Sequence, residues 1–208
     1  MPQTKPILAL VALALVLGAC DTNDVFEDDT LVYRATLAPL NDSGVSGTAT
    51  FTISDEGDLE LTDDDELQVS VTASGLDDTV HPQHIHAEAE CPAPSADDNG
   101  DGFVDIAEGN PAYGAILAPL DGQLLDAEAQ AGTFPEGASI SYSQEVDYDD
   151  FLDAYDLDDD ALDLGGRTVV LHGTTRDLPD TVASMPGLPN ETTLPVACGE
   201  IELVGTDG

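Results

Sequence analysis

The stretch LQVSVTA, Leu67 to Ala73, decides the fold class because apolar and polar residues alternate along it. Side chains two positions apart in a strand point the same way, so one face carries Leu67, Val69, Val71 and Ala73. The stretch GTATFTI, Gly47 to Ile53, repeats the pattern with Ala49, Phe51 and Ile53 on one face. A period of two predicts half-buried strands with one side in water.

Further segments outward from this pair extend the β pattern over one domain, residues 31 to 205. Predicted strands cover Leu31–Leu37, Ala112–Leu120, Ala138–Val146, Arg167–Gly173 and Leu194–Leu203. Turn sequences rich in Gly, Asn and Asp separate the early strands. Tyr148–Leu162 has apolar residues near helical spacing and predicts a short acidic helix, whereas Pro92–Pro111 resembles a loop. Short strands with little helix predict an all-β fold, an antiparallel sandwich or barrel.

The N-terminus resembles a bacterial lipoprotein signal. Lys5 precedes an apolar run, Ile7 to Leu17, which is too short to cross a bilayer. The sequence LGAC, ending at Cys20, then resembles the site where such proteins are cleaved and lipidated. We therefore expect a signal peptide over residues 1–19, a lipid on Cys20 and an acidic tether over residues 20–30. This implies a lipid anchor in a membrane of the cell envelope, either periplasmic or at the cell surface.

The charge of the chain is extreme, with a formal net charge of −39 at pH 7. Loss of the signal peptide would leave three arginines against 43 acidic residues, a surface that repels nucleic acid and anionic lipid. The apolar fraction of 41% and the strand patterns favour a folded protein over a disordered one. Acidic surfaces of this kind occur in proteins of halophiles, because molar salt shortens the Debye length to about 3 Å. A hypersaline source is a hypothesis.

Two cysteines remain once Cys20 is assigned to the lipid. Cys91 and Cys198 would share an oxidising compartment in an exported chain, where a disulfide is the expected state. The alternative is a pair of thiols that bind a metal. Neither cysteine belongs to a Cys-x-x-Cys motif, so the disulfide is favoured.

The stretch DDNGDGFVDIAE, Asp97 to Glu108, matches a calcium-binding loop of the EF-hand type at every specified position. Ca²⁺ takes six to eight oxygen ligands, and this spacing would supply Asp97, Asn99, Asp101, the Phe103 carbonyl, Asp105 and Glu108. The alternative is a chance match in an acid-rich chain. Prolines before the loop, with Gly109 and Pro111 after it, leave no room for the usual helix pair. The loop is therefore predicted to hold a structural ion.

The stretch HPQHIH, His81 to His86, holds three of the four histidines. In a strand His84 and His86 share a face, and His172 ends another predicted strand that the fold could bring beside them. His81 lies out of this register and precedes a proline, so it approaches the pair or misses it. Three or four imidazoles suit copper or zinc. The alternative is a polar strand face without a metal.

Two segments resemble known families. The first, GVSGTATFTISDEG with VSVTASGLDDTVHPQHIHAEAECP, is similar to the first half of copper/zinc superoxide dismutase-like domains and to the CHRD module. The second, GGRTVVLHG with LPVACGEI, resembles the end of the dismutase. The likeness implies a Greek-key β-barrel, copper ligands at His84, His86 and His172, and a Cys91–Cys198 disulfide. The chain also resembles a group of secreted bacterial proteins that carry His-Ile-His, an Asn-Gly-Asp-Gly loop and Val-Val-His-Gly.

The departures from the dismutase pattern concern catalysis. No histidine lies between His86 and His172, so the zinc ligands are missing, and Pro195 stands near the position of an anion-guiding arginine. A strongly negative surface also opposes the approach of superoxide. The leading interpretation is a metal-binding envelope lipoprotein with calcium in the loop and copper or zinc at the histidines. The alternatives are a copper-only superoxide dismutase and a CHRD-like surface module without a transition metal.

Overall fold

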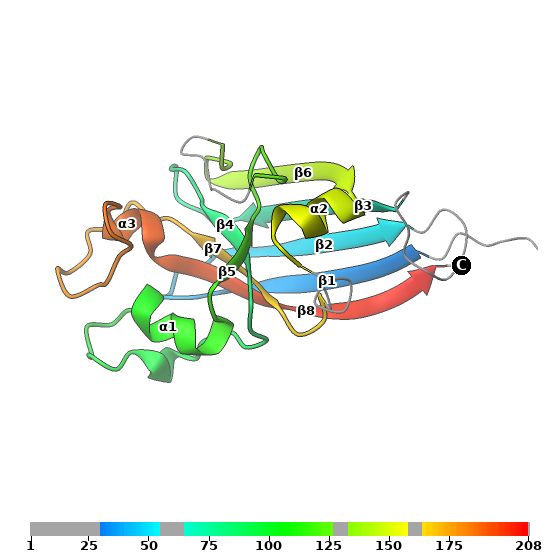
Figure 1. Ribbon diagram of the computed structural model, residues 1–208. Coiled ribbons are helices and arrows are strands. Elements are labelled where there is room, and N and C mark those ends of the chain that lie inside the picture. The colour runs from blue at the N-terminus through cyan, green and yellow to red at the C-terminus, as the bar shows by residue number, and fades with distance from the viewer. Residues whose placement is uncertain (1–29, 55–64, 127–132, 158–163, 208) are drawn as a thin grey trace, which may run out of the picture.

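The computed structural model describes residues 30–54, 65–126, 133–157 and 164–207 (Figure 1). The expected signal peptide, Cys20 and nearly all of the acidic tether lie outside these residues. Within the described ranges, no helix has the length and apolar character needed to span a membrane.

The described residues form eight strands in one antiparallel sheet. The strands are β1 (Thr30–Pro39), β2 (Ser46–Ser54), β3 (Glu66–Ser74), β4 (Gln83–His86), β5 (Ile116–Pro119), β6 (Ser139–Asp147), β7 (Thr168–His172) and β8 (Pro195–Asp207). Their order across the sheet is β5-β4-β7-β8-β1-β2-β3-β6. The all-β prediction is confirmed in this form: a curled, mostly antiparallel sheet with few helices.

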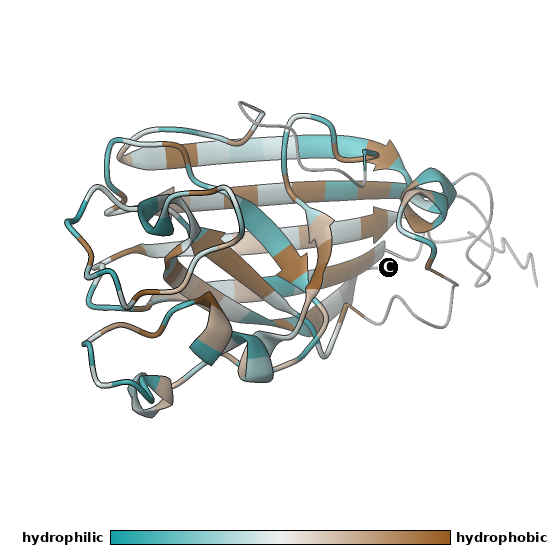
Figure 2. Cartoon of the chain, turned by 60° about the vertical axis from the view of Figure 1, so that its left-hand side comes forward, coloured by the Kyte–Doolittle hydropathy of each residue, from teal (hydrophilic) through white to brown (hydrophobic). Residues whose placement is uncertain are grey.

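The core lies on the concave side of the curled sheet. Both sets of side chains that the alternation assigned to one face are buried: Ala49, Phe51, Ile53, Leu67, Val69, Val71 and Ala73. Phe51 pairs with Val69 in the register of β2 and β3, and the same core cluster contains Ile85 of β4 and Leu171 of β7. The short strands therefore close over the long ones, with the alternation visible as brown and teal bands in Figure 2.

Two short helices lie beside this sheet: one packs against the core, and the other leads into β8. α2 (Tyr148–Ala154) is capped by the Asp147 side chain, which accepts from the Asp150 N–H, and it buries Phe151 and Leu152. This confirms a short helix where Tyr148–Leu162 predicted one, although residues 158–163 lie outside the described ranges. α3 (Asn190–Thr193) precedes β8 at the end of the sheet opposite the C-terminus (Figure 1).

The connection between β4 and β5 differs from the sequence prediction. It contains a 3₁₀ helix, Pro94–Ala96, and an α-helix, α1 (Ile106–Tyr113), so the prediction of a loop over Pro92–Pro111 is wrong where α1 begins. The Asp105 side chain accepts from the Ala107 and Glu108 N–H groups, and the Glu108 side chain accepts from the Asp105 N–H. This capping box satisfies the first turn of α1 and supports the helix, although Pro111 removes one hydrogen bond from its interior. The strand expected from Ala112 consequently begins only at Ile116.

Candidate metal centre

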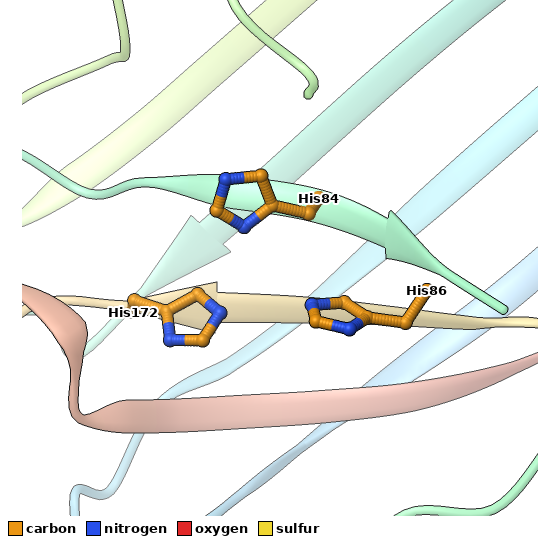
Figure 3. Close-up of side chains that lie close together, drawn as sticks. All are labelled: His84, His86 and His172. Atoms are coloured by element: carbon orange, nitrogen blue, oxygen red, sulfur yellow. The ribbon is translucent and has the colours of Figure 1, made fainter. Parts of the chain in front are cut away.

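Three histidines from two neighbouring strands converge on one point. β4 carries His84 and His86 on the same side, with Ile85 in the core on the other, and β7 ends at His172. β4 and β7 pair antiparallel, which places His172 next to the His-x-His pair. One ring nitrogen of each lies within 4.8 Å of the others, and Figure 3 shows the rings turned toward a common space. All three side chains are buried, so the alternative of an exposed polar strand face is wrong.

Backbone carbonyls fix the orientation of two of these rings. The Nδ1 of His86 lies 2.9 Å from the Gly114 carbonyl oxygen, and the Nδ1 of His172 lies 2.8 Å from the Thr193 carbonyl oxygen. A carbonyl oxygen only accepts, so each Nδ1 carries the proton and each Nε2 keeps a lone pair. Such second contacts orient ligating histidines in metal sites.

Three further ring nitrogens of these histidines are buried without a hydrogen-bond partner. The buried Nε2 atoms of His86 and His172 and the buried Nδ1 of His84 are all unpartnered. Buried polar atoms are almost always satisfied, so three orphaned nitrogens in one place require an explanation. A metal ion bound among them satisfies all three at once, so the residues present fit a metal.

Burial keeps the imidazoles in the form that binds metal. Loss of hydration lowers the pKa of His84 well below its usual value, and the neighbouring histidines lower it further. Burial also lowers the pKa of His86, and it lowers the pKa of His172 to about 3. The three rings are therefore neutral at pH 7, with lone pairs available to a cation.

Aromatic rings and two glycines shape the walls of the centre. The Tyr113 ring packs at 4.6 Å from the His86 ring, and the Phe134 ring at 5.5 Å from the His84 ring. Gly114 and Gly173 both have positive φ, and a Cβ on Gly173 would lie 2.5 Å from the Val80 carbonyl oxygen. Only glycine allows the backbone to pass this closely beside the ends of α1 and β7.

His81 does not join the cluster, contrary to the prediction that it could serve as a fourth ligand. Its ring is fully buried, with Nδ1 3.0 Å from the His172 carbonyl oxygen and Nε2 2.9 Å from the Asp77 carbonyl oxygen. Both ring nitrogens thus face backbone acceptors instead of the space between the other rings. His81 links the β3–β4 connection to the end of β7, and the odd register before Pro82 was the signal of this separate role.

The acidic loop, residues 97–108, is folded around its own backbone. The Asp97 carboxylate accepts from the N–H groups of Gly100, Asp101 and Gly102, while the Glu108 carboxylate accepts from those of Asp98 and Asn99. Asn99, Asp101 and Asp105 accept similar bonds from their neighbours, and the Phe103 ring lies 4.8 Å below the Arg176 guanidinium. A metal ion can be shared by three or more His, Cys, Asp or Glu side chains that lie close enough together. Within the described ranges, the three histidines form the one such group. Calcium in the loop remains a prediction.

The predicted disulfide between Cys91 and Cys198 is confirmed. The two Cα atoms lie 5.7 Å apart, and the bond joins positions 107 residues apart. Cys91 lies between the histidine strand and the acidic loop, so the bond fastens this connection to β8. Both sulfurs are used in the bond, which excludes the alternative of thiol metal ligands.

Several groups at the centre were missed at the level of sequence. The carbonyls of Gly114 and Thr193 orient two ligands, yet every residue has a carbonyl and none is distinctive. Tyr113 and Phe134 pack on the rings from connections whose path the sequence pattern did not predict. The Gly that follows Tyr113 was the one usable signal, because glycine is common where a helix ends.

Comparison with known proteins identifies no relative of this chain, so the interpretation of the centre rests on its donor atoms. A scan against models of known protein families gives no match for the chain, and a search of curated proteins gives none. Three neutral imidazoles in a buried site suit the divalent ions of copper and zinc, which prefer nitrogen ligands. Three ligands also leave a coordination position open for water or another small molecule.

Proposed function

We propose that this protein binds copper or zinc through His84, His86 and His172. The observation that carries the proposal is the set of three buried ring nitrogens without partners, one from each histidine. Leaving a buried polar atom unsatisfied costs roughly 1–3 kcal/mol. The fold nevertheless holds three such atoms together, which supports a site built for a cation and not for packing.

The proposed setting is the cell envelope, with a lipid on Cys20 as the membrane anchor. The apolar run Ile7–Leu17 and the small residues before Cys20 support this assignment. The Cys91–Cys198 disulfide supports export, because disulfides persist in oxidising compartments. Residues 31–205 would then form the exported domain.

The proposed fold family is the superoxide dismutase-like or CHRD-like Greek-key barrel. Support comes from the curled antiparallel sheet, from the His-Ile-His strand beside the strand that ends at His172, and from the disulfide. A CHRD-like module without a transition metal is the weaker variant, because it leaves the orphaned nitrogens of the three histidines unexplained.

Copper-dependent dismutation of superoxide is the second candidate function. The open position beside three imidazoles favours it, since a redox reaction needs a site for the small molecule. The net charge of −39 opposes it, because an anion is repelled unless salt screens the surface. Metal binding or storage is therefore the primary proposal, and turnover is secondary to it.

Calcium binding by the acidic loop is proposed as an additional, structural function. The ligands would be Asp97, Asn99, Asp101, the Phe103 carbonyl, Asp105 and Glu108. The contact of Glu108 with the N–H groups of Asp98 and Asn99 supports the proposal, because it brings the twelfth position of the loop onto its beginning. An extracellular loop of this type has an affinity on the order of 10⁻⁴–10⁻³ M.

A metal titration of the purified domain tests the primary proposal. We expect one Cu²⁺ or Zn²⁺ per chain in the wild type and a loss of stoichiometric binding in His84→Ala and His172→Ala. The control is Asp98→Asn, which removes one exposed carboxylate away from the cluster and should keep the stoichiometry. Wild-type protein that retains no copper or zinc after dialysis would refute the proposal. A superoxide assay on the copper-loaded protein then decides whether the centre turns over.

A further inference from the structure

Asn41 makes an unusual set of hydrogen bonds for a residue in a turn. It lies between β1 and β2 with a φ of 54°, in the left-handed region. Its side-chain amide donates to the Val104 carbonyl at 3.0 Å and to the Pro195 carbonyl at 2.9 Å, and its oxygen accepts from the Val104 N–H at 2.7 Å. The two partners are 63 and 154 positions away along the chain. One short side chain thus fastens together two distant segments.

The bond to Pro195 reaches the segment that orients His172. Pro195 begins β8 directly after Leu194, whose carbonyl accepts from the Gly173 N–H at 3.1 Å. Two residues before Pro195, the Thr193 carbonyl accepts from the Nδ1–H of His172. The position of this carbonyl therefore depends on where the start of β8 is held.

The bonds to Val104 reach the segment that orients His86. Val104 is buried, and it precedes Asp105, the residue that caps α1. At its other end α1 terminates at Gly114, whose carbonyl accepts from the Nδ1–H of His86. A short capped helix transmits displacement along its axis, so the start of α1 helps to set the position of this second carbonyl.

We propose that Asn41 is a positioning residue of the histidine centre. Its amide holds the start of β8 and the start of α1 at a fixed separation, and those two segments carry the carbonyls that orient His172 and His86. The inference rests on the proposed metal binding by the three histidines, and it deepens that proposal by naming a residue without contact to the ion. Groups that hydrogen-bond directly to metal ligands typically contribute about 10- to 100-fold to metal affinity, so a residue one step further away should contribute about 10-fold or less.

Cobalt titration of the Asn41→Gly variant tests the inference, because the visible absorption of bound Co²⁺ reports the geometry of its ligands. Glycine adopts a positive φ freely, so the change removes the amide without straining the turn. We expect Co²⁺ affinity to fall by up to about 10-fold, with an altered visible spectrum. The matched control is Asp42→Gly, which changes the next residue of the same turn, also at a positive φ of 52° but with an exposed side chain. The control should bind Co²⁺ as the wild type does.

A second variant and a second measurement guard against a general loss of folding. Asn41→Asp keeps the size of the side chain and the acceptor for the Val104 N–H, but it loses the donors to both carbonyls. In the metal-free protein we expect the Nδ1–H proton of His172 to exchange with solvent faster in this variant, as seen by proton NMR. This readout does not require metal, so it separates a failure of the inference from a failure of the proposed function.

Three results would overturn the inference. The first is wild-type Co²⁺ affinity and spectrum in both variants, and the second is unchanged exchange of the His172 ring proton. The third is loss of the folded circular dichroism signal in both variants, which would make Asn41 a general stability residue. Variants with lower thermal stability but unchanged Co²⁺ binding would also overturn the inference.

Discussion

His86 of the histidine centre precedes Asp97, the first residue of the acidic loop, by eleven positions. The polar side-chain atoms of the two regions nevertheless differ in their hydrogen bonding. At the centre, three buried ring nitrogens are left without partners. In the loop, the carboxylates of Asp97 and Glu108 are bonded to N–H groups of the loop itself. The centre thus has unpartnered nitrogens available to a ligand, whereas these two carboxylates of the loop are already bonded to its backbone.

This difference in hydrogen bonding follows from how far apart in the sequence the residues of each region lie. The loop is local, because all of its ligand positions fall within twelve residues. The centre is not local, since β4 supplies two histidines and β7 supplies the third from far along the chain. A non-local site can hold unsatisfied atoms only when a stable sheet fixes them. The centre should therefore depend on the pairing of distant strands, whereas the loop combines its own turns with contacts from Asn41, Thr181 and Ala183.

Removal of the disulfide should produce the largest effect, because it releases the connection that joins the two regions. Replacing Cys91 and Cys198 together by alanine frees a span of 107 positions. The chain-entropy model gives a loss of about 4–5 kcal/mol in the free energy of unfolding. Urea denaturation followed by circular dichroism measures it. An unchanged midpoint would mean that the sheet alone holds the connection.

Asp105→Ala should have the next largest effect, because this residue belongs to the loop and also begins α1. Its carboxylate is buried, caps α1 and accepts from the Ala183 N–H at 2.6 Å. Loss of the cap and an unsatisfied Ala183 N–H together cost about 2–3 kcal/mol. The control Asp98→Ala alters an exposed neighbour and should stay within about 0.5 kcal/mol in the same denaturation experiment. Equal effects in the two variants would contradict the special role of Asp105.

Mild acid, between pH 7 and pH 6, should weaken the metal-free protein through the histidines of the centre. The pKa values of His84 and His172 are lowered in the folded state, so the unfolded state takes up protons first as the pH falls below about 6.5. Stability is therefore fully present above that pH and is lost below it. Between pH 7 and pH 6 we expect roughly 1–1.5 kcal/mol for the two residues together. Thermal melts in chelator measure the loss, and His172→Asn should reduce it.

Calcium should produce the smallest effect, because the loop is already closed by its own hydrogen bonds. Ca²⁺ at five times its dissociation constant stabilises a protein by about 1 kcal/mol. Melting curves with Ca²⁺ should show this gain in the wild type and in Asp98→Asn, and no gain in Asp101→Asn. A similar gain in Asp101→Asn would place the ion elsewhere on the acidic surface.

The parts of the structure that the sequence predicted well are those set by local pattern. Alternation located β2, β3 and β6, because each has one buried and one wet face, while β-rich composition located β1. The helix α1 was missed because Gly109 and Pro111 have low helix propensity, although Asp105 and Glu108 already had capping-box spacing. Here tertiary packing and capping outweighed propensity.

The site was predictable only in part. The shared face of His84 and His86 follows from strand geometry. The approach of His172 depends on the pairing of β4 with β7, and local pattern contains no information on it, so the family resemblance supplied that expectation. His81 lay closer in sequence but was turned away by two backbone carbonyls, which sequence spacing does not reveal.

The contact between His172 and the Thr193 carbonyl has a consequence for when the centre can form. During synthesis, His84 and His86 emerge long before β7, and the carbonyl that orients His172 emerges 107 residues after His86. A growing or partly threaded chain therefore presents two histidines but no complete centre. The proposed metal site is therefore complete only after Thr193 has been synthesised and β7 has paired with β4.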